Sequence, residues 1–330
     1  MPEEWKKQSL LVTGANGGIA RITCQLLAEK DLGRIALACR SHSSAVQVRE
    51  DLIRALPAAN HTQLEPYGGF DMYSLEKIRA SVDTLPQDKP FDMVFLSVGG
   101  PVFSKSFQVV PWGKYEVEEN VCKNTLGSHA TLLALKNRGL LKKGCRVVFA
   151  GGEMSRGYKY VAAQPQFSQP QELREYILQT RQLAQPYKAM DAYAIGKFTG
   201  VLWLQKAASV LDGEASLISM SPGFTYGTHI NDRMPALQRW LLTNVYIRFM
   251  RWRGQSAGPQ EGAVKFADCL KGTVGTHGQV LGAPAGRTLG PLSDQLPMNP
   301  YFTKGPLIEE FWRILEDLCG PWHGEASQKP

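Results

Sequence analysis

The sequence predicts an α/β fold in which one doubly wound parallel sheet is flanked by helices. Short apolar runs alternate along the chain with amphipathic helical stretches, and a glycine-rich loop follows the first apolar run. Of the 330 residues, 43% are apolar and 20% are charged, which is ordinary for a globular protein. This composition excludes a disordered, collagen-like or coiled-coil chain. The length would allow two domains, but the unbroken alternation favours a single domain over residues 1–330.

The apolar runs are the predicted strands. In chain order these strands span Ser9–Thr13, Ile35–Cys39, Leu64–Phe70, Asp92–Val98, Arg146–Ala150 and Ala215–Met220. The third run is the weakest, because Pro66 has no N–H to donate and argues against a central strand. Apolar residues at helical spacing predict the helices between the strands. These helices span Gly18–Lys30, Val46–Leu56, Leu75–Val82, Tyr115–Lys136 and Asp191–Leu211.

Three further segments lie outside this alternation. Residues 153–188 predict a helical insertion, because Ser168-Gln169-Pro170-Gln171 resembles a capping box with proline early in the helix. Residues 232–253 combine aromatic side chains with arginines and predict a helical lid over a substrate pocket. A helix packed on the core, or a helix in shallow contact with an anionic membrane surface, is the alternative for this segment. Residues 304–319 predict an amphipathic C-terminal helix.

Charge and cysteine usage limit the function classes. The net charge is +7, but there is no run of five like charges and no zinc-finger or RNA-binding signature, so a nucleic-acid partner is not expected. The six cysteines form no C-x-x-C pair and predict buried reduced thiols rather than disulfides or a metal site. No run of about 18 apolar residues is present, and acidic Glu3 and Glu4 precede the first strand. A cytoplasmic protein without a metal is therefore expected.

The loop after the first strand predicts a nucleotide site. It reads Thr13-Gly14-Ala15-Asn16-Gly17-Gly18-Ile19-Ala20. Glycines let the backbone turn tightly and approach a pyrophosphate, and the following helix offers free N–H groups to phosphate oxygens. The alternative is a generic strand-to-helix turn. The position of the loop after the first strand favours a dinucleotide and a Rossmann-type sheet.

The end of the second strand predicts which dinucleotide is bound. Arg40, followed by Ser41, stands where NAD-binding chains often carry Asp or Glu. A guanidinium there would bind the 2′-phosphate of NADP(H), and such a charge-assisted bond is worth roughly 1.5–3 kcal/mol. The alternative is a solvated arginine after a turn. We expect NADP(H) as the cofactor.

A second motif, Tyr193-Ala194-Ile195-Gly196-Lys197, places a phenol and an ammonium one helical turn apart. The ammonium would favour the phenolate and lower the pKa of Tyr193 toward neutrality. The tyrosine could then exchange a proton with a substrate oxygen. Tyr and Lys at this spacing are common on helix surfaces, but the glycine loop at residues 13–20 makes the combination specific.

Together these motifs resemble the short-chain dehydrogenase/reductase superfamily over about residues 8–285. The resemblance implies roles for the matching residues. Tyr193 would be the proton donor, Lys197 its activator and an anchor for the nicotinamide ribose, and Asn124 the holder of a relay water. Thr13, Gly14, Asn16, Gly17, Gly18 and Ile19 would bind the pyrophosphate, Asp71 and Met72 the adenine, and Pro222, Gly223, Thr225 and Thr228 the nicotinamide amide. Carbonyl reductases and retinol dehydrogenases are the groups it most resembles.

The chain departs from the family pattern at three places. Ala20 replaces the last glycine of the loop, and the family's N-N-A-G appears as Leu96-Ser97-Val98-Gly99. The strand-end Ser-Ser, whose second serine donates a hydrogen bond to the substrate, appears as Gly151-Gly152. Ser155 is the predicted substitute for this donor, and Glu153 is the other polar candidate.

The sequence therefore predicts an NADPH-dependent reductase of a carbonyl, or a related C=N or C=C bond, in a fairly large apolar small molecule. The missing serine motivates a second hypothesis, in which the scaffold catalyses a non-redox cyclisation, isomerisation or elimination. A non-catalytic nucleotide sensor is the third. By analogy with carbonyl reductases, the insertion at 153–188 would cover the long helices that commonly pair subunits, so a monomer is expected.

Overall fold

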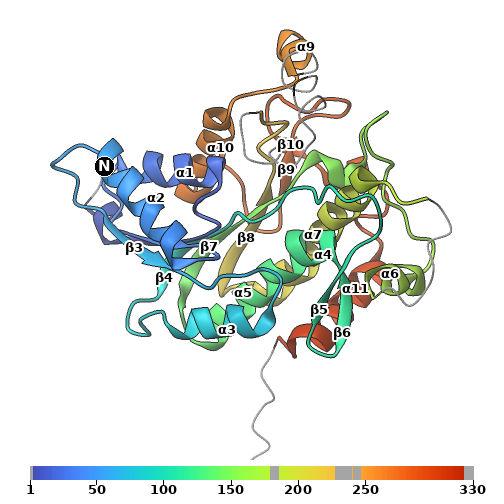
Figure 1. The fold of residues 1–330 in the computed structure, drawn as a ribbon, viewed down its shortest axis with the longest axis horizontal. Helices are drawn as coiled ribbons and strands as arrows, with labels where there is room; N and C mark the ends of the chain where they lie inside the picture. The colour runs from blue at the N-terminus through green and yellow to red at the C-terminus, as the bar shows by residue number, and fades with distance from the viewer. Residues whose placement is uncertain (1–2, 179–185, 227–239, 241–246, 323–330) are drawn as a thin grey trace, which may run out of the picture.

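The computed structural model describes residues 3–178, 186–226, 240 and 247–322. Its centre is one eight-stranded sheet with the strand order β10-β9-β8-β7-β4-β1-β2-β3 (Figure 1). Neighbouring strands are parallel except for the pair β9 and β10. The strands are β1 Ser9–Thr13, β2 Arg34–Ala38, β3 Gln63–Tyr67, β4 Phe91–Leu96, β7 Leu141–Ala150, β8 Ala215–Met220, β9 Val280–Gly282 and β10 Ser293–Asp294. The predicted α/β class is confirmed.

Helices cover both faces of the sheet (Figure 1). One face carries α1 Gly18–Ala28, α2 His42–Ala55 and α10 Pro259–Lys271; the other carries α3 Leu75–Asp83, α5 Gly127–Asn137, α7 Ala189–Leu211 and α11 Gly305–Cys319. In β1, Leu10 and Val12 pack on the face covered by α1, α2 and α10, and Leu11 packs on the opposite face. Since every residue of this strand is buried, a continuous apolar run rather than an alternating one is required.

The strand order fixes where a ligand can bind. Chain connections leave β1 in one direction toward β2 and β3, and in the other direction toward β4 and β7. At such a reversal the flanking loops separate and open a crevice at the carboxyl edge of the sheet. Pro66 lies in β3, which is the edge strand, as its missing N–H predicts.

The helix predicted from Tyr115 is wrong over its first residues. Val109–Trp112 and Tyr115–Glu118 instead form the hairpin β5–β6, and the helical part starts with α4 Glu119–Val121. Gly113 adopts a left-handed φ of 61° in the turn, and Trp112 is buried with its Nε1 donating to the Leu318 carbonyl at 3.0 Å. This long-range anchor lies beyond the reach of local periodicity. The short strands β9 and β10 were also not predicted from the sequence.

The insertion at residues 153–188 contains a 3₁₀ turn at Glu153–Arg156 and the helix α6 Pro170–Ile177, and residues 179–185 lie outside the described part. Helix α6 packs on α11, where Arg174 pairs with Glu310 and with Asp317. The C-terminal helix α11 also packs on α7. Helix α11 thus covers part of the surface of α7 and carries α6 on it, and a monomer remains our expectation.

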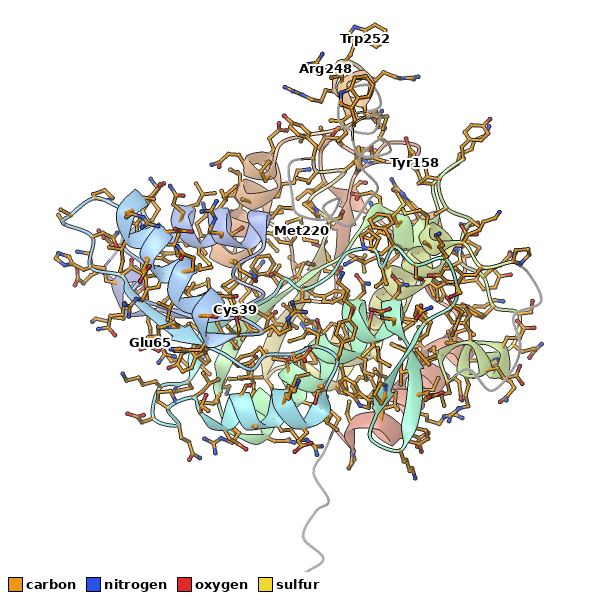
Figure 2. All side chains as sticks on the ribbon, viewed as in Figure 1. Cys39, Glu65, Tyr158, Met220, Arg248 and Trp252 are labelled. Atoms are coloured by element: carbon orange, nitrogen blue, oxygen red, sulfur yellow. The ribbon has the colours of Figure 1, made fainter. Side chains whose placement is uncertain are left out.

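The lid predicted at residues 232–253 lies mostly outside the described residues. Trp240 and α9 Ile247–Trp252 are described, and Arg248 and Trp252 project from the tip of α9 (Figure 2). None of the helices in the described part of the chain combines the length and apolar character needed to cross a bilayer. The lid remains a prediction.

Candidate active site

A cavity of about 500 Å³ opens at the carboxyl edge of the sheet, where the order of the strands reverses. The glycine loop after β1 forms one wall, and Ser97, Val98 and Gly99 after β4 form another. Cys39, which directly follows β2, and Met220, the last residue of β8, are labelled in Figure 2. The cavity therefore opens at the position where α/β sheets bind their ligands.

The glycine loop fits a pyrophosphate. Gly14 has a φ of 63°, and a Cβ on it would lie 2.8 Å from the Val98 side chain, so a larger residue is excluded. Helix α1 starts at Gly18 without a capping side chain. The N–H groups of its first turn are therefore available to an anion at the cavity wall.

The second-strand end fits an additional phosphate. Arg40 is exposed and lines the cavity. Ser41 caps α2, since its Oγ accepts the Ser44 N–H at 3.2 Å, and the first turn of α2 carries no acid. A cation and an acid-free helix N-terminus favour a negatively charged group over a ribose hydroxyl here.

Most of the predicted nucleotide residues line this cavity. Those that do so are Gly14, Asn16, Gly17, Gly18, Ile19, Arg40, Asp71, Met72, Ser97, Val98, Gly99, Lys197 and Pro222. Thr13 does not, because its hydroxyl links the strands by donating to the Phe95 carbonyl and accepting the Ser97 N–H. Ser41 is used as a helix cap, Gly223 and Thr225 line the neighbouring cavity, and Thr228 lies outside the described residues.

Asn124 sits in a π-helical turn, Cys122–Leu126, between α4 and α5. Its Nδ2 donates to the Asn120 carbonyl at 2.9 Å, and its Oδ1 accepts the Gly100 N–H at 2.8 Å. The side chain thus takes the carbonyl that an α-helix would bond to the backbone of residue 124, and the helix widens locally. Asn124 is fully buried and ties the helix to the loop after β4.

Lys197 and Asn124 meet at Gly99. A Cβ on Gly99 would lie 2.6 Å from Lys197 Nζ and 3.0 Å from Asn124 Oδ1, so only glycine fits between them. Lys197 Nζ donates to the Ala150 carbonyl at 2.8 Å. Burial, with a smaller contribution from Lys123, lowers the pKa of Lys197 to about 7, against the raising effect of Glu153. The side chain of Lys197 can therefore gain or lose a proton near neutral pH.

Tyr193 lies on the same face of α7 as Lys197. Burial, and then the charge of Glu153, raises the pKa of its phenol above the ordinary value. The expectation that Lys197 lowers this pKa is wrong, because burial dominates and Lys197 Nζ donates to the Ala150 carbonyl. Tyr193 consequently stays protonated at neutral pH, which is the form that donates a proton.

A second cavity of about 490 Å³ adjoins the first, and its wall is mainly apolar. The apolar side chains that line it are Ile19, Pro101, Phe103, Met154, Val161, Met190, Phe224, Ile247 and Met250. Tyr193, Gly151, Ile19 and Pro222 line both cavities, so the two spaces meet at these residues. A nucleotide in the first cavity and an apolar molecule in the second would both lie against Tyr193.

After the end of β7, the structure separates the two candidates for the missing serine, Ser155 and Glu153. Gly152 and Glu153 line the apolar cavity, whereas Ser155 is buried and lines neither cavity. Ser155 lies in the 3₁₀ turn Glu153–Arg156. The turn is closed by the Ser155 N–H, which donates to the Gly152 carbonyl at 3.0 Å. The structure thus brings Glu153, and not Ser155, to the cavity.

Sequence reasoning missed several residues of the nucleotide cavity. Lys123 lies beside Asn124 in the π-helical turn, and Phe70, Tyr73 and Phe266 also line the wall. Lys123 directly precedes the recognised Asn124, so its turn position could have identified it. Phe266 lies on α10, far along the chain, and no local signal indicates its place.

The chain was compared with known protein families and with curated proteins. No model of a known protein family matches the chain. A curated relative, short chain dehydrogenase sol3 of Alternaria solani, is 27% identical over 235 residues, which are 70% of this chain and 76% of the relative. The chain is thus similar in sequence to a short-chain dehydrogenase, in agreement with the resemblance that the glycine loop and the Tyr193 and Lys197 pair indicate.

Solved structures share the fold of this chain. An uncharacterised protein from Mycobacterium paratuberculosis has a TM-score of 0.62 and 16% identity, with 95% of this chain and 93% of that chain covered. A short-chain dehydrogenase/reductase (glucose/ribitol dehydrogenase) from Brucella melitensis has a TM-score of 0.54 and 16% identity, over 88% and 100% of the chains. NAD⁺-bound xylitol dehydrogenase has a TM-score of 0.54 and 17% identity, over 81% and 94%.

Gly152 departs from the pattern of the short-chain dehydrogenases that the chain resembles, and the structure has room for the missing side chain. The φ of Gly152 is 178°, an extended value that any residue adopts, and a Cβ would lie 3.5 Å from the aliphatic carbons of Lys197. These are ordinary van der Waals contacts. Glycine at this position is therefore not required by packing.

We expect Gly152→Ser to fold normally and to increase kcat/KM for ketones by roughly tenfold or more, because its hydroxyl would supply the absent donor. Gly151→Ser is the matched control: its Cβ would lie 2.5 Å from the buried Ser219 Oγ, so it should lower the melting temperature without a gain in turnover. Steady-state kinetics and thermal denaturation check both variants. A correctly folded Gly152→Ser with unchanged or lower turnover would contradict the expectation.

Proposed function

We propose that this chain is an NADPH-dependent reductase of a carbonyl, or a related C=N or C=C bond, in a fairly large apolar small molecule. The observation that carries the proposal is the position of Tyr193, which lines both the nucleotide cavity and the apolar cavity. The raised pKa of this phenol keeps its proton available at neutral pH. A protonated phenol serves reduction, whereas alcohol oxidation would need the phenolate.

In the proposed mechanism the bound dinucleotide supplies the hydride. The glycine loop and the first turn of α1 would hold its pyrophosphate, and Lys197 would hold the nicotinamide ribose. The apolar wall of the second cavity binds the substrate and excludes water from the reacting bond. Tyr193 donates its proton to the substrate oxygen as negative charge develops there, and the buried Lys197 and Asn124 support the return of a proton.

Direct measurement of NADPH consumption tests this function. The assay follows the absorbance of the reduced nicotinamide with a panel of apolar aldehydes, ketones, quinones and imines. Consumption with at least one class, dependent on Tyr193, is the expected result. Binding of NADPH without consumption across the panel would contradict reduction and favour a nucleotide sensor. The absence of a serine at Gly152 favours the non-redox alternative. To test that alternative, the products formed from the same panel are analysed.

NADPH preference is proposed to depend on Arg40. We expect Arg40→Asp to weaken NADPH binding by roughly 10- to 100-fold, because one charge-assisted bond to the 2′-phosphate is lost and a like charge is added. NADH binding should change much less. Calorimetric titration of both nucleotides measures the effect, with Arg54→Asp near the other end of α2 as the control. An unchanged ratio of the two affinities would refute the role of Arg40.

A further inference from the structure

Glu153 is a buried carboxylate in the wall of an otherwise apolar cavity. It is 5% exposed, follows β7 in the 3₁₀ turn and lines the same space as Tyr193. Its Oε1 accepts the Ala283 N–H at 3.0 Å, and its Oε2 bonds to the Ser221 hydroxyl. The mechanism above assigns no task to this group.

The hydrogen bonds place Glu153 as an acceptor at both oxygens. The Gly223 N–H donates to Ser221 Oγ at 3.3 Å, so the serine directs its own proton to Glu153. The Ala283 N–H donates to the other carboxylate oxygen.

Within the described part of the chain, this carboxylate forms no direct ion pair, although the charges of Arg156, Lys197 and Lys265 act on it over a longer distance. Arg156 carries a buried guanidinium, but it donates to the carbonyls of Ala283, Pro284 and Arg287 and to Gln295. A buried carboxylate that lacks a direct ion pair is stabilised further when a cation enters beside it. The cavity adjoining Glu153 is where such a cation can be placed.

The other hydroxyls of the described cavity wall are committed within the protein. Thr225 donates to the Gly223 carbonyl at 3.2 Å, and Thr288 donates to the Gln255 carbonyl at 2.6 Å. The phenols of Tyr158 and Tyr193 are the remaining side-chain hydroxyls of this wall. Away from these phenols, the wall therefore offers a substrate an anion rather than a hydrogen-bond donor.

We propose that Glu153 is a specificity residue that binds a protonated amine, so that the substrate class is an apolar aminoketone. The inference rests on the proposed reductase function. In the reaction a hydride adds to the carbonyl carbon, the C=O π pair moves to oxygen, and Tyr193 supplies the proton that completes the alcohol. The ammonium group stays protonated throughout and neutralises Glu153.

Two ketones of matched shape test this assignment: 1-benzylpiperidin-4-one and 4-benzylcyclohexanone, compared with NADPH at a pH below the pKa of the amine. We expect kcat/KM to favour the aminoketone by roughly 10- to 100-fold, and Glu153→Gln to collapse this ratio. Glu310→Gln removes a carboxylate of similar burial, 7% exposed, on α11 and should leave the ratio intact. Equal use of both ketones by the unmodified protein, or an unchanged ratio in Glu153→Gln, would overturn the proposal.

A binding measurement separates this inference from the reductase function. The non-reducible 1-benzylpiperidine should raise the melting temperature of the unmodified protein more than benzylcyclohexane does, and Glu153→Gln should lose the difference. Stabilisation by the amine without reduction of either ketone would support the cation site and contradict the reductase. Reduction of ketones without stabilisation by the amine would support the reductase and overturn the cation site.

Discussion

Tyr193→Phe should lower turnover by roughly 10²–10⁴ while leaving the fold and NADPH binding intact. The substitution removes one hydroxyl at the junction of the two cavities. The aromatic ring keeps its packing on α7, so the melting temperature should change little. The loss should appear in kcat, because the proton is needed when charge develops on the substrate oxygen.

Tyr158→Phe is the matched control for this experiment. Tyr158 also lines the apolar cavity but not the nucleotide cavity, and it is labelled in Figure 2. Its removal should alter substrate binding far more than turnover. Near-full turnover in Tyr193→Phe would reject proton donation by this phenol and favour the non-redox alternative.

Lys197→Met should abolish measurable reduction, by roughly 10²-fold or more, and at the same time stabilise the folded protein. Lys197 is 3% exposed, and burial lowers its pKa from 10.5 to about 7. A pKa displaced this far corresponds to a destabilisation on the order of 4 kcal/mol near pH 7. The bond from Nζ to the Ala150 carbonyl is lost on substitution, so the expected net gain is about 1–3 kcal/mol.

The stability difference between Lys197→Met and the unmodified protein should change with pH in a defined direction. Between about pH 7 and 10.5 the unfolded chain holds a proton on Lys197 that the folded chain has released, so stability rises with pH across this window. The advantage of Lys197→Met is therefore largest at and below pH 7 and shrinks as the pH approaches 10.5. Urea denaturation at several pH values measures it, with exposed Lys143→Met as the control. A less stable Lys197→Met at pH 7 would contradict the account of burial.

The main sheet could be predicted from the sequence because each strand buried on both faces needs a continuous apolar run, and each helix a periodic one. Pro66 even indicated the edge strand. The hairpin β5–β6 escaped prediction because Trp112 is held by Leu318, which is distant in the chain. The strands β9 and β10 are three and two residues long, too short for a period to show.

The glycine loop, Tyr193 and Lys197 could be recognised because their spacing along one loop and one helix is local. Asn124 needed the family resemblance, since its π-helical turn leaves no local pattern. The polar group after β7 could not be placed, because a 3₁₀ turn decides that Glu153 and not Ser155 reaches the cavity. Whether Glu153 forms a direct ion pair depends on where Arg156 donates, which only the tertiary structure shows.

Hydride transfer from NADPH is the central claim, and isotope transfer tests it most directly. The protein is incubated with NADPH in which both hydrogens at C4 of the nicotinamide are replaced by deuterium, together with an apolar aminoketone, and the product is analysed by mass spectrometry. The account predicts one deuterium bonded to the carbinol carbon, and loss of this product in Tyr193→Phe. A product formed without deuterium, or formed equally well by Tyr193→Phe, would contradict the account.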